Sequence, residues 1–109
     1  MTYVDAFAAA VPTENREAFR RKAEAMAALF KEHGALQVVD CWGGEVTSFP
    51  LAVKCEPDET VVFGWMVWPS RAARDDAMAK AMADPRMSHD QPFDGKRLIF
   101  GGFEVIVER

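Results

Sequence analysis

The order of secondary-structure elements constrains the fold of this chain more than any other feature of its sequence. Short apolar runs are typical of strands, and longer runs with apolar residues at three- and four-residue intervals are typical of helices. Here they follow one another as strand, helix, strand, strand, helix, strand. The chain has 109 residues, the usual size of one domain, and shows no linker. We therefore expect a single α+β domain over residues 1–109.

Four runs rich in β-branched and aromatic residues predict strands. The last run is interrupted by Gly101 and Gly102, a pair that indicates a bulge or a close approach of another part of the chain. A further segment, before the turn at Pro57, is extended in character. The predicted strands and this extended segment are Tyr3–Val11, Ala35–Trp42, Thr60–Trp68, Lys96–Val107 and Phe49–Cys55.

Two amphipathic runs predict helices. The first begins after Thr13, whose side chain we expect to cap it, and it ends at Gly34. The second begins after Ser70, another expected cap, and runs to about Ala83. Short connections and right-handed crossovers then favour a ferredoxin-like βαββαβ sandwich, with both helices on one face of an antiparallel sheet. In that arrangement the first strand lies between the third and the fourth.

The composition argues against several classes of partner. The net charge is −4 and the basic residues form no stripe, whereas binding to nucleic acid requires clustered Lys and Arg. No apolar run approaches the roughly 20 residues that span a bilayer, and the N-terminus has no signal-peptide pattern. Cys41 and Cys55 lack metal-ligand spacing, and His33 and His89 are isolated. We expect a cytoplasmic protein with no metal and no cofactor.

Side chains alternate along a strand, so each strand presents two faces. The small residues Val4, Ala6, Ala8 and Ala10 suit a face that is covered by helices. The opposite row would then leave an apolar patch on the second face of the sheet, and large patches of this kind mark interfaces. We therefore expect two such sheets to close on each other in a homodimer. The patch would contain Tyr3, Phe7, Trp42, Phe100 and one row of the third strand.

Several short blocks of the sequence, in order along nearly the whole chain, carry a resemblance to a known family. Gly34–Leu36, Asp58–Phe63, Trp68–Arg71, Met82–Met87, Pro92–Arg97 and Gly101–Glu104 are the blocks concerned. Together they resemble the YbaA-like bacterial proteins (domain of unknown function 1428), a family of the dimeric α/β-barrel superfamily. The resemblance implies a ferredoxin-like fold and a homodimer, and it implies no activity or catalytic residues. The sequence departs from the family pattern after Trp42, where a longer polar loop is expected.

Three carboxylates interrupt otherwise apolar strands and are the candidate catalytic residues: Asp5, Asp40 and Glu104. A carboxyl group in an apolar cleft has a raised pKa and can act as an acid or a base. The alternative, which we favour, is that each one pairs with a basic residue or lies at a hydrated sheet edge. The basic residues considered for this pairing are Arg97, Lys96 and Lys54.

Aromatic residues in the strands could line a pocket for a small molecule, although such residues more often belong to a core or an interface. The candidate ligand-binding residues are Tyr3, Trp42, Trp65, Phe100 and Arg97. Three functions remain open at this point. The dimer binds a small apolar molecule in the barrel, or it is an enzyme such as a cofactor-independent monooxygenase or isomerase, or it is an interaction protein with a filled barrel. The enzyme hypothesis rests on analogy between folds.

Overall fold

The structure is a computed structural model that describes residues 2–88 and 90–109. It consists of a four-stranded antiparallel sheet in the order β2-β3-β1-β4, with helices that connect the strands. The elements are β1 (Tyr3–Pro12), α1 (Arg16–Glu32), β2 (Gln37–Trp42), α2 (Phe49–Ala52), β3 (Glu59–Trp68), α3 (Arg71–Ala83) and β4 (Ile99–Glu104), with 3-10 helices at Thr13–Asn15 and Gly95–Arg97.

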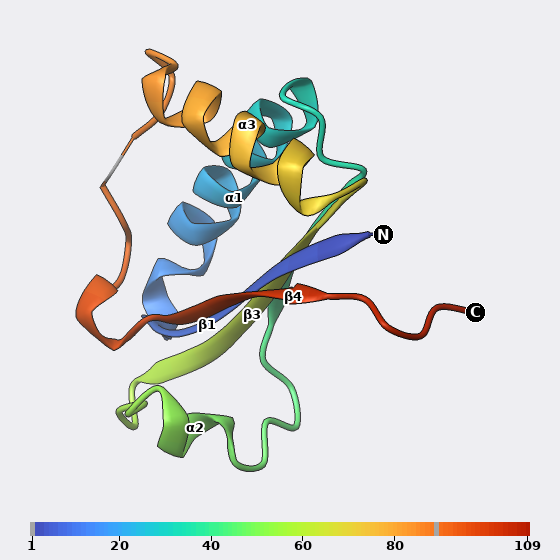
Figure 1. Cartoon of the computed structure of the whole chain (residues 1–109). Helices are drawn as coiled ribbons and strands as arrows, with labels where there is room; N and C mark the ends of the chain where they lie inside the picture. The colour runs from blue at the N-terminus through green and yellow to red at the C-terminus, as the bar shows by residue number, and fades with distance from the viewer. Residues whose placement is uncertain (1, 89) are drawn as a thin grey trace.

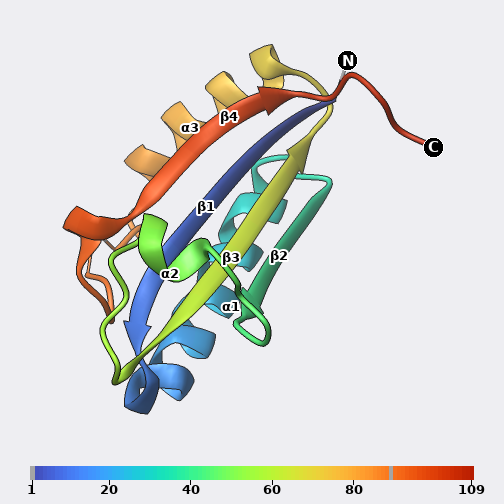
Figure 2. The same cartoon turned by 90° about the horizontal axis from the view of Figure 1, so that it is seen from below.

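The two long helices, α1 and α3, lie on the same face of the sheet (Figure 1). Seen from below, the short helix α2 lies in front of the sheet, and α1 and α3 lie behind it (Figure 2). The chain therefore forms a helical layer on one face and leaves the other face to the segment around α2. The predicted α+β class and the placement of both long helices on one face are confirmed.

Strand β1 holds the sheet together because it pairs along its whole length. It pairs with β3 from Tyr3 opposite Trp68 to Pro12 opposite Glu59, and on its other side with β4. Strand β4 ends at Glu104, opposite the first residue of β1, so the chain beyond it has no strand to pair with. The prediction that the last strand runs from residue 96 to 107 was therefore too long.

Two local predictions were wrong, and a third is confirmed. The segment expected to be extended before the Glu56–Asp58 turn forms α2, with Pro50 in its first turn, where a missing N–H costs nothing. Thr13 does not cap α1, because its hydroxyl is 2.7 Å from the hydroxyl of Thr60. Ser70 does cap α3, since its Oγ accepts a hydrogen bond from the N–H of Ala73 at 3.1 Å.

The two faces of the sheet are reversed relative to the sequence-based expectation. Tyr3, Phe7 and Trp42 point towards α1 and α3, where they pack with core residues such as Phe19 and Trp68. The small residues lie on the other face instead, where Ala8 and Ala10 pack beneath Val53 of the segment that follows α2. Small side chains suited this face because a covering loop comes close to the sheet. Within the described ranges, none of the helices has the length and apolar character of a membrane crossing.

Candidate functional site

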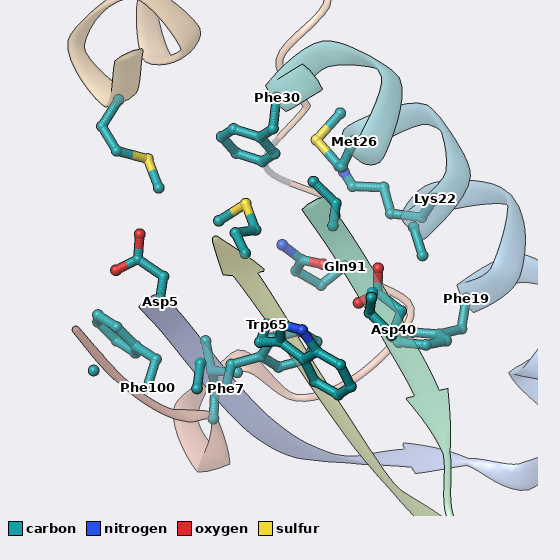
Figure 3. Close-up of a pocket in the computed structure, with 18 of the residues that line it drawn as sticks. Asp5, Phe7, Phe19, Lys22, Met26, Phe30, Asp40, Trp65, Gln91 and Phe100 are labelled. Carbon is teal, nitrogen blue, oxygen red and sulfur yellow. The ribbon is translucent and has the colours of Figure 1, made fainter. Parts of the chain in front are cut away.

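A cavity of about 520 Å³ lies between the sheet and the helices α1 and α3 (Figure 3). Its wall is mostly apolar and rich in aromatic and thioether side chains, with a few charged or amide groups among them. The larger apolar side chains come from both helices, from the strands and from the segment before β4, and they include Phe7, Phe19, Met26, Phe30, Trp65, Met66, Met78, Phe93, Leu98 and Phe100. The charged or amide groups are Asp5, Lys22, Asp40, Arg74 and Gln91.

The floor of the cavity depends on a residue without a side chain, Gly64 in β3. Strand pairing places Gly64 between Asp40 of β2 and Phe7 of β1. A Cβ atom at Gly64 would lie 2.7 Å from Asp40 Oδ1 and 2.9 Å from the main-chain oxygen of Val39, and it would also collide with the ring of Phe7. The glycine therefore lets the carboxylate and the ring converge over β3, as their labelled side chains show in Figure 3.

Asp5 is a structural anchor in the cavity wall. Its carboxylate accepts hydrogen bonds from Arg74 of α3, with Nη2 2.8 Å from Oδ1 and Nε 3.0 Å from Oδ2. The indole N–H of the buried Trp68 donates to the same carboxylate at 2.9 Å. The hydrogen bonds from Arg74 to Asp5, and next the one to Asp75, raise the pKa of Arg74. Asp5 and Arg74 thus neutralise each other and fix α3 to the centre of the sheet.

Asp40 is in a different situation. It lines the cavity on the side opposite Asp5 (Figure 3). No side chain or main-chain group among the described residues donates a hydrogen bond to its carboxylate, and none forms an ion pair with it. The neighbouring wall desolvates the carboxylate and so raises the pKa of Asp40, although much of the residue stays accessible. Asp40 is the carboxylate of this site with capacity left for another molecule.

The segment between α3 and β4 closes one side of the cavity and is tied to α1. Lys22 Nζ donates to the main-chain oxygens of Ser88 and Asp90 at 2.8 and 2.7 Å. Asn15 Nδ2 donates to the oxygen of Pro92 at 2.9 Å. These contacts hold Gln91 and Phe93 in the cavity wall.

Of the residues predicted from the sequence, the structure brings Asp5, Asp40, Trp65 and Phe100 to the cavity. Trp65 borders it from the far side of the sheet, where its ring packs on Phe63 and its N–H donates to Gln37 Oε1 at 3.3 Å. Phe100 lines the cavity at the edge strand and is 79% exposed.

The other predicted residues lie elsewhere. Tyr3 is buried under the guanidinium groups of Arg71 and Arg74, and Trp42 packs against Phe19 with Arg16 over its ring. Glu104 is at the end of β4, opposite Tyr3, and does not line the cavity.

Arg97 belongs to a separate cluster near the start of β3. It forms two hydrogen bonds of 2.7 Å with Glu59, which lower the pKa of that carboxyl, and it also reaches Asp94. The expected partner for a strand carboxylate was Arg97, Lys96 or Lys54, but Asp5 pairs with Arg74 instead. Helix α3 passes over β1 and brings Arg74 there.

Sequence reasoning did not identify Lys22 and Arg74 as site residues. A signal for Arg74 does exist, because it lies one helical turn before Met78 and so shares the inward side of α3. For Lys22 no such signal exists, since its partners are main-chain oxygens of a distant segment.

Metal ligation finds no support in the described part of the chain, where no three His, Cys, Asp or Glu side chains come together. His33 lies 3.3 Å from Asp84, at the ends of α1 and α3. His89 lies outside the described residues. Cys41 and Cys55 are free thiols.

Comparison with known proteins places the chain in a family. The family model described as "Protein of unknown function (DUF1428)" matches residues 2–95. Proteins named "Uncharacterized protein YbaA" from Escherichia coli K12, Escherichia coli O157:H7 and Shigella flexneri are each 50% identical to this chain over 116 residues, which cover 99% of both sequences. That aligned length exceeds the 109 residues here, so the relatives contain residues without a counterpart in this chain. The chain therefore belongs to the DUF1428 family, whose function is unknown.

Proposed function

We propose that this protein binds a small, largely apolar molecule in the cavity between the sheet and the helices α1 and α3. The observation that carries the proposal is the cavity itself, about 520 Å³ in a domain of 109 residues. It is partly open to solvent and largely apolar. Ligand sites are clefts of about 300–1,000 Å³ with mostly apolar walls and a few polar groups. The size and the chemistry of this cavity are therefore typical of a binding site.

The chemistry of the wall supports the same proposal. Met26, Met66 and Met78 are flexible and polarisable, so they adapt to the shape of an apolar ligand. Phe7 and Phe19 offer rings against which a flat group packs. The ligand was expected in the centre of a dimeric barrel, whereas this cavity is on the helical side of the sheet.

The proposal includes a ferredoxin-like fold and a homodimer of the dimeric α/β-barrel type in the cytoplasm. The strand order β2-β3-β1-β4 supports the fold, and the two free cysteines support the location. The sheet face opposite α1 and α3 supports the dimer, because it carries apolar side chains and no charged residue across the middle of the sheet. Its members include Val4, Ala6, Val39, Phe63, Trp65, Val67, Ile99 and Phe103. An uncharged face of this kind suits a second copy of itself in a two-fold contact.

A second candidate function is acid–base catalysis on the bound molecule, as in an isomerase or a cofactor-independent monooxygenase. Asp40 is the observation that favours it, because desolvation raises its pKa and no described group neutralises it. A carboxyl group in this state exchanges a proton with a substrate closer to neutral pH. Asp5 is less suited, since Arg74 and Trp68 occupy its carboxylate.

Native mass spectrometry of protein purified from its own cells tests the binding proposal. The wild type should carry a retained small molecule as extra mass. Ala23→Phe, which fills the cavity from α1, should lose it, and Ala25→Phe on the exposed side of the same helix should retain it. Extra mass that remains in Ala23→Phe would contradict the assignment to this cavity.

Sedimentation velocity tests the dimer. Phe103 is 59% exposed on the uncharged face, so Phe103→Glu should shift a dimer to the monomer mass. Ala72→Glu on the exposed surface of α3 should leave the dimer intact. A wild-type monomer at all concentrations would refute this part of the proposal.

A further inference from the structure

The polar groups of the cavity are unequal in what they can still bind, and this difference restricts the ligand. Arg74 uses Nε and Nη2 on Asp5 and Nη1 on Asp75. Lys22 uses its ammonium group on two main-chain oxygens. Both cations that line the cavity are therefore already held by oxygen atoms of the protein: Arg74 by carboxylates, and Lys22 by two main-chain carbonyls.

The carboxylate of Asp40, in contrast to Arg74 and Lys22, has no hydrogen-bond partner among the residues that the structure describes. Its Oδ1 lies over Gly64 beside the ring of Phe7, and no donor among residues 2–88 and 90–109 contacts it. Apolar neighbours remove part of the water around this carboxylate while much of the residue stays accessible, so a partner of opposite charge is worth somewhat more there than on an open surface. Among the charged side chains of the cavity, the carboxylate of Asp40 is thus the group with no hydrogen-bond partner in the described part of the chain.

The rings of the wall add to this preference. Phe7 stands next to the carboxylate, and Phe19 lines the same cavity. The faces of aromatic rings attract cations, most strongly where water is excluded. An ammonium group at Asp40 would therefore meet a carboxylate and an aromatic ring together, while the rest of the ligand packs among the thioethers.

From these contacts we infer that the ligand of the cavity is an organic cation, an apolar molecule that carries a protonated amine held by Asp40. This inference rests on the proposed function, since it names the class of molecule that the cavity binds. It gives Asp40 a role in specificity, and it gives Asp5 and Arg74 a structural role.

Isothermal titration calorimetry with three probes of similar shape distinguishes a cationic, a neutral and an anionic ligand. The probes are naphthylmethylamine, naphthylmethanol and naphthoate. The wild type should bind the amine roughly tenfold more tightly than the alcohol, as one charge-assisted hydrogen bond predicts, and should bind naphthoate most weakly. Asp40→Asn should bind the amine no more tightly than the alcohol. Asp76→Asn, on the exposed side of α3, should keep the preference.

Two results would overturn the inference. Equal binding of the amine and the alcohol by the wild type, or a preference that survives in Asp40→Asn, would refute the cationic ligand and leave the binding cavity in place. If none of the three probes binds the wild type, the proposed function fails as well. Retained binding of the alcohol by Asp40→Asn shows that the variant is folded and that its cavity is open.

Discussion

Arg74 of α3 and Asp5 of β1 form a two-point ion pair, with Nη2–Oδ1 and Nε–Oδ2 distances of 2.8 and 3.0 Å. The two side chains are only 25% and 14% exposed. The pair joins a helix to the central part of the sheet and forms part of the cavity wall. One of the carboxylates that the sequence suggested as catalytic therefore forms an ion pair between a helix and the sheet.

Removal of the Arg74 guanidinium should destabilise the folded protein. Arg74→Met keeps the apolar stem but leaves Asp5 with Trp68 as its remaining donor, so we expect a loss of about 2–3 kcal/mol in the free energy of unfolding in urea. Lys80→Met breaks the exposed pair with Asp76 and should cost about 0.5 kcal/mol or less. The double variant Asp5→Asn/Arg74→Met should recover part of the loss. Equal losses of unfolding free energy in Arg74→Met and Lys80→Met would show that the Arg74–Asp5 pair stabilises the fold no more than an exposed pair does.

Gly64→Ala tests the floor of the cavity. The new methyl group would meet the main-chain oxygen of Val39 at 2.9 Å, which side-chain motion cannot relieve. We expect a destabilisation of about 1–3 kcal/mol in urea unfolding, together with weaker binding of apolar probes. Gly44→Ala is the matched control, because a Cβ there has no atom within 4 Å. If the two variants lose the same free energy of unfolding, the close contacts around position 64 do not require a glycine there.

Asp40→Asn tests whether the carboxylate is a desolvated charge. Burial raises the pKa of Asp40 in the folded protein, so ionisation costs the folded state more than the unfolded state. The variant should therefore be more stable than the wild type at about pH 7, and the difference should vanish below about pH 3, where the carboxyl group is protonated in both states. Urea unfolding across this pH range provides the measurement. A wild type that is the more stable protein at neutral pH would mean that Asp40 has a favourable partner.

Asp84 should show the opposite dependence on pH. Hydrogen bonds from the side chain and main chain of Arg86, and from His33, hold the pKa of Asp84 well below its usual range. The unfolded state then binds the proton first, so the stability from this group is present above about pH 4 and is lost as the pH falls further. Asp84→Asn should have a flatter acid limb than the wild type in urea unfolding. Parallel acid limbs for the two proteins would contradict this role of Asp84.

The order of the four strands and the two long helices could be predicted from the sequence, because periodicity and turn residues are local. Strand β3 and the cap at Ser70 follow from such signals. The face of each strand could not be predicted in the same way. Both rows of β1 are apolar apart from Asp5, and one row packs under helices while the other packs under the segment around Val53. The residues of the strand itself do not show which of its two faces packs against helices and which packs against a loop.

The same limit applies to the site. Asp40 and Phe100 were identified because a charge or a large ring in a strand is conspicuous. Their neighbours Lys22 and Arg74 were not, because their partners lie 66 and 69 residues away along the chain. Such contacts depend on how the helices are placed on the sheet, which is a property of the whole fold.

We propose above that the space between the sheet and the helices binds a small apolar molecule. The measurement that tests this claim is a titration with naphthylmethanol, followed by the amide NMR signals of the wild type and of Ala23→Phe. Saturable shifts of the signals from Asp5, Phe7, Gly64 and Met66, absent in Ala23→Phe, are the predicted result. Shifts confined to the opposite face, around Phe63 and Phe103, or no saturable shift at all, would contradict the claim.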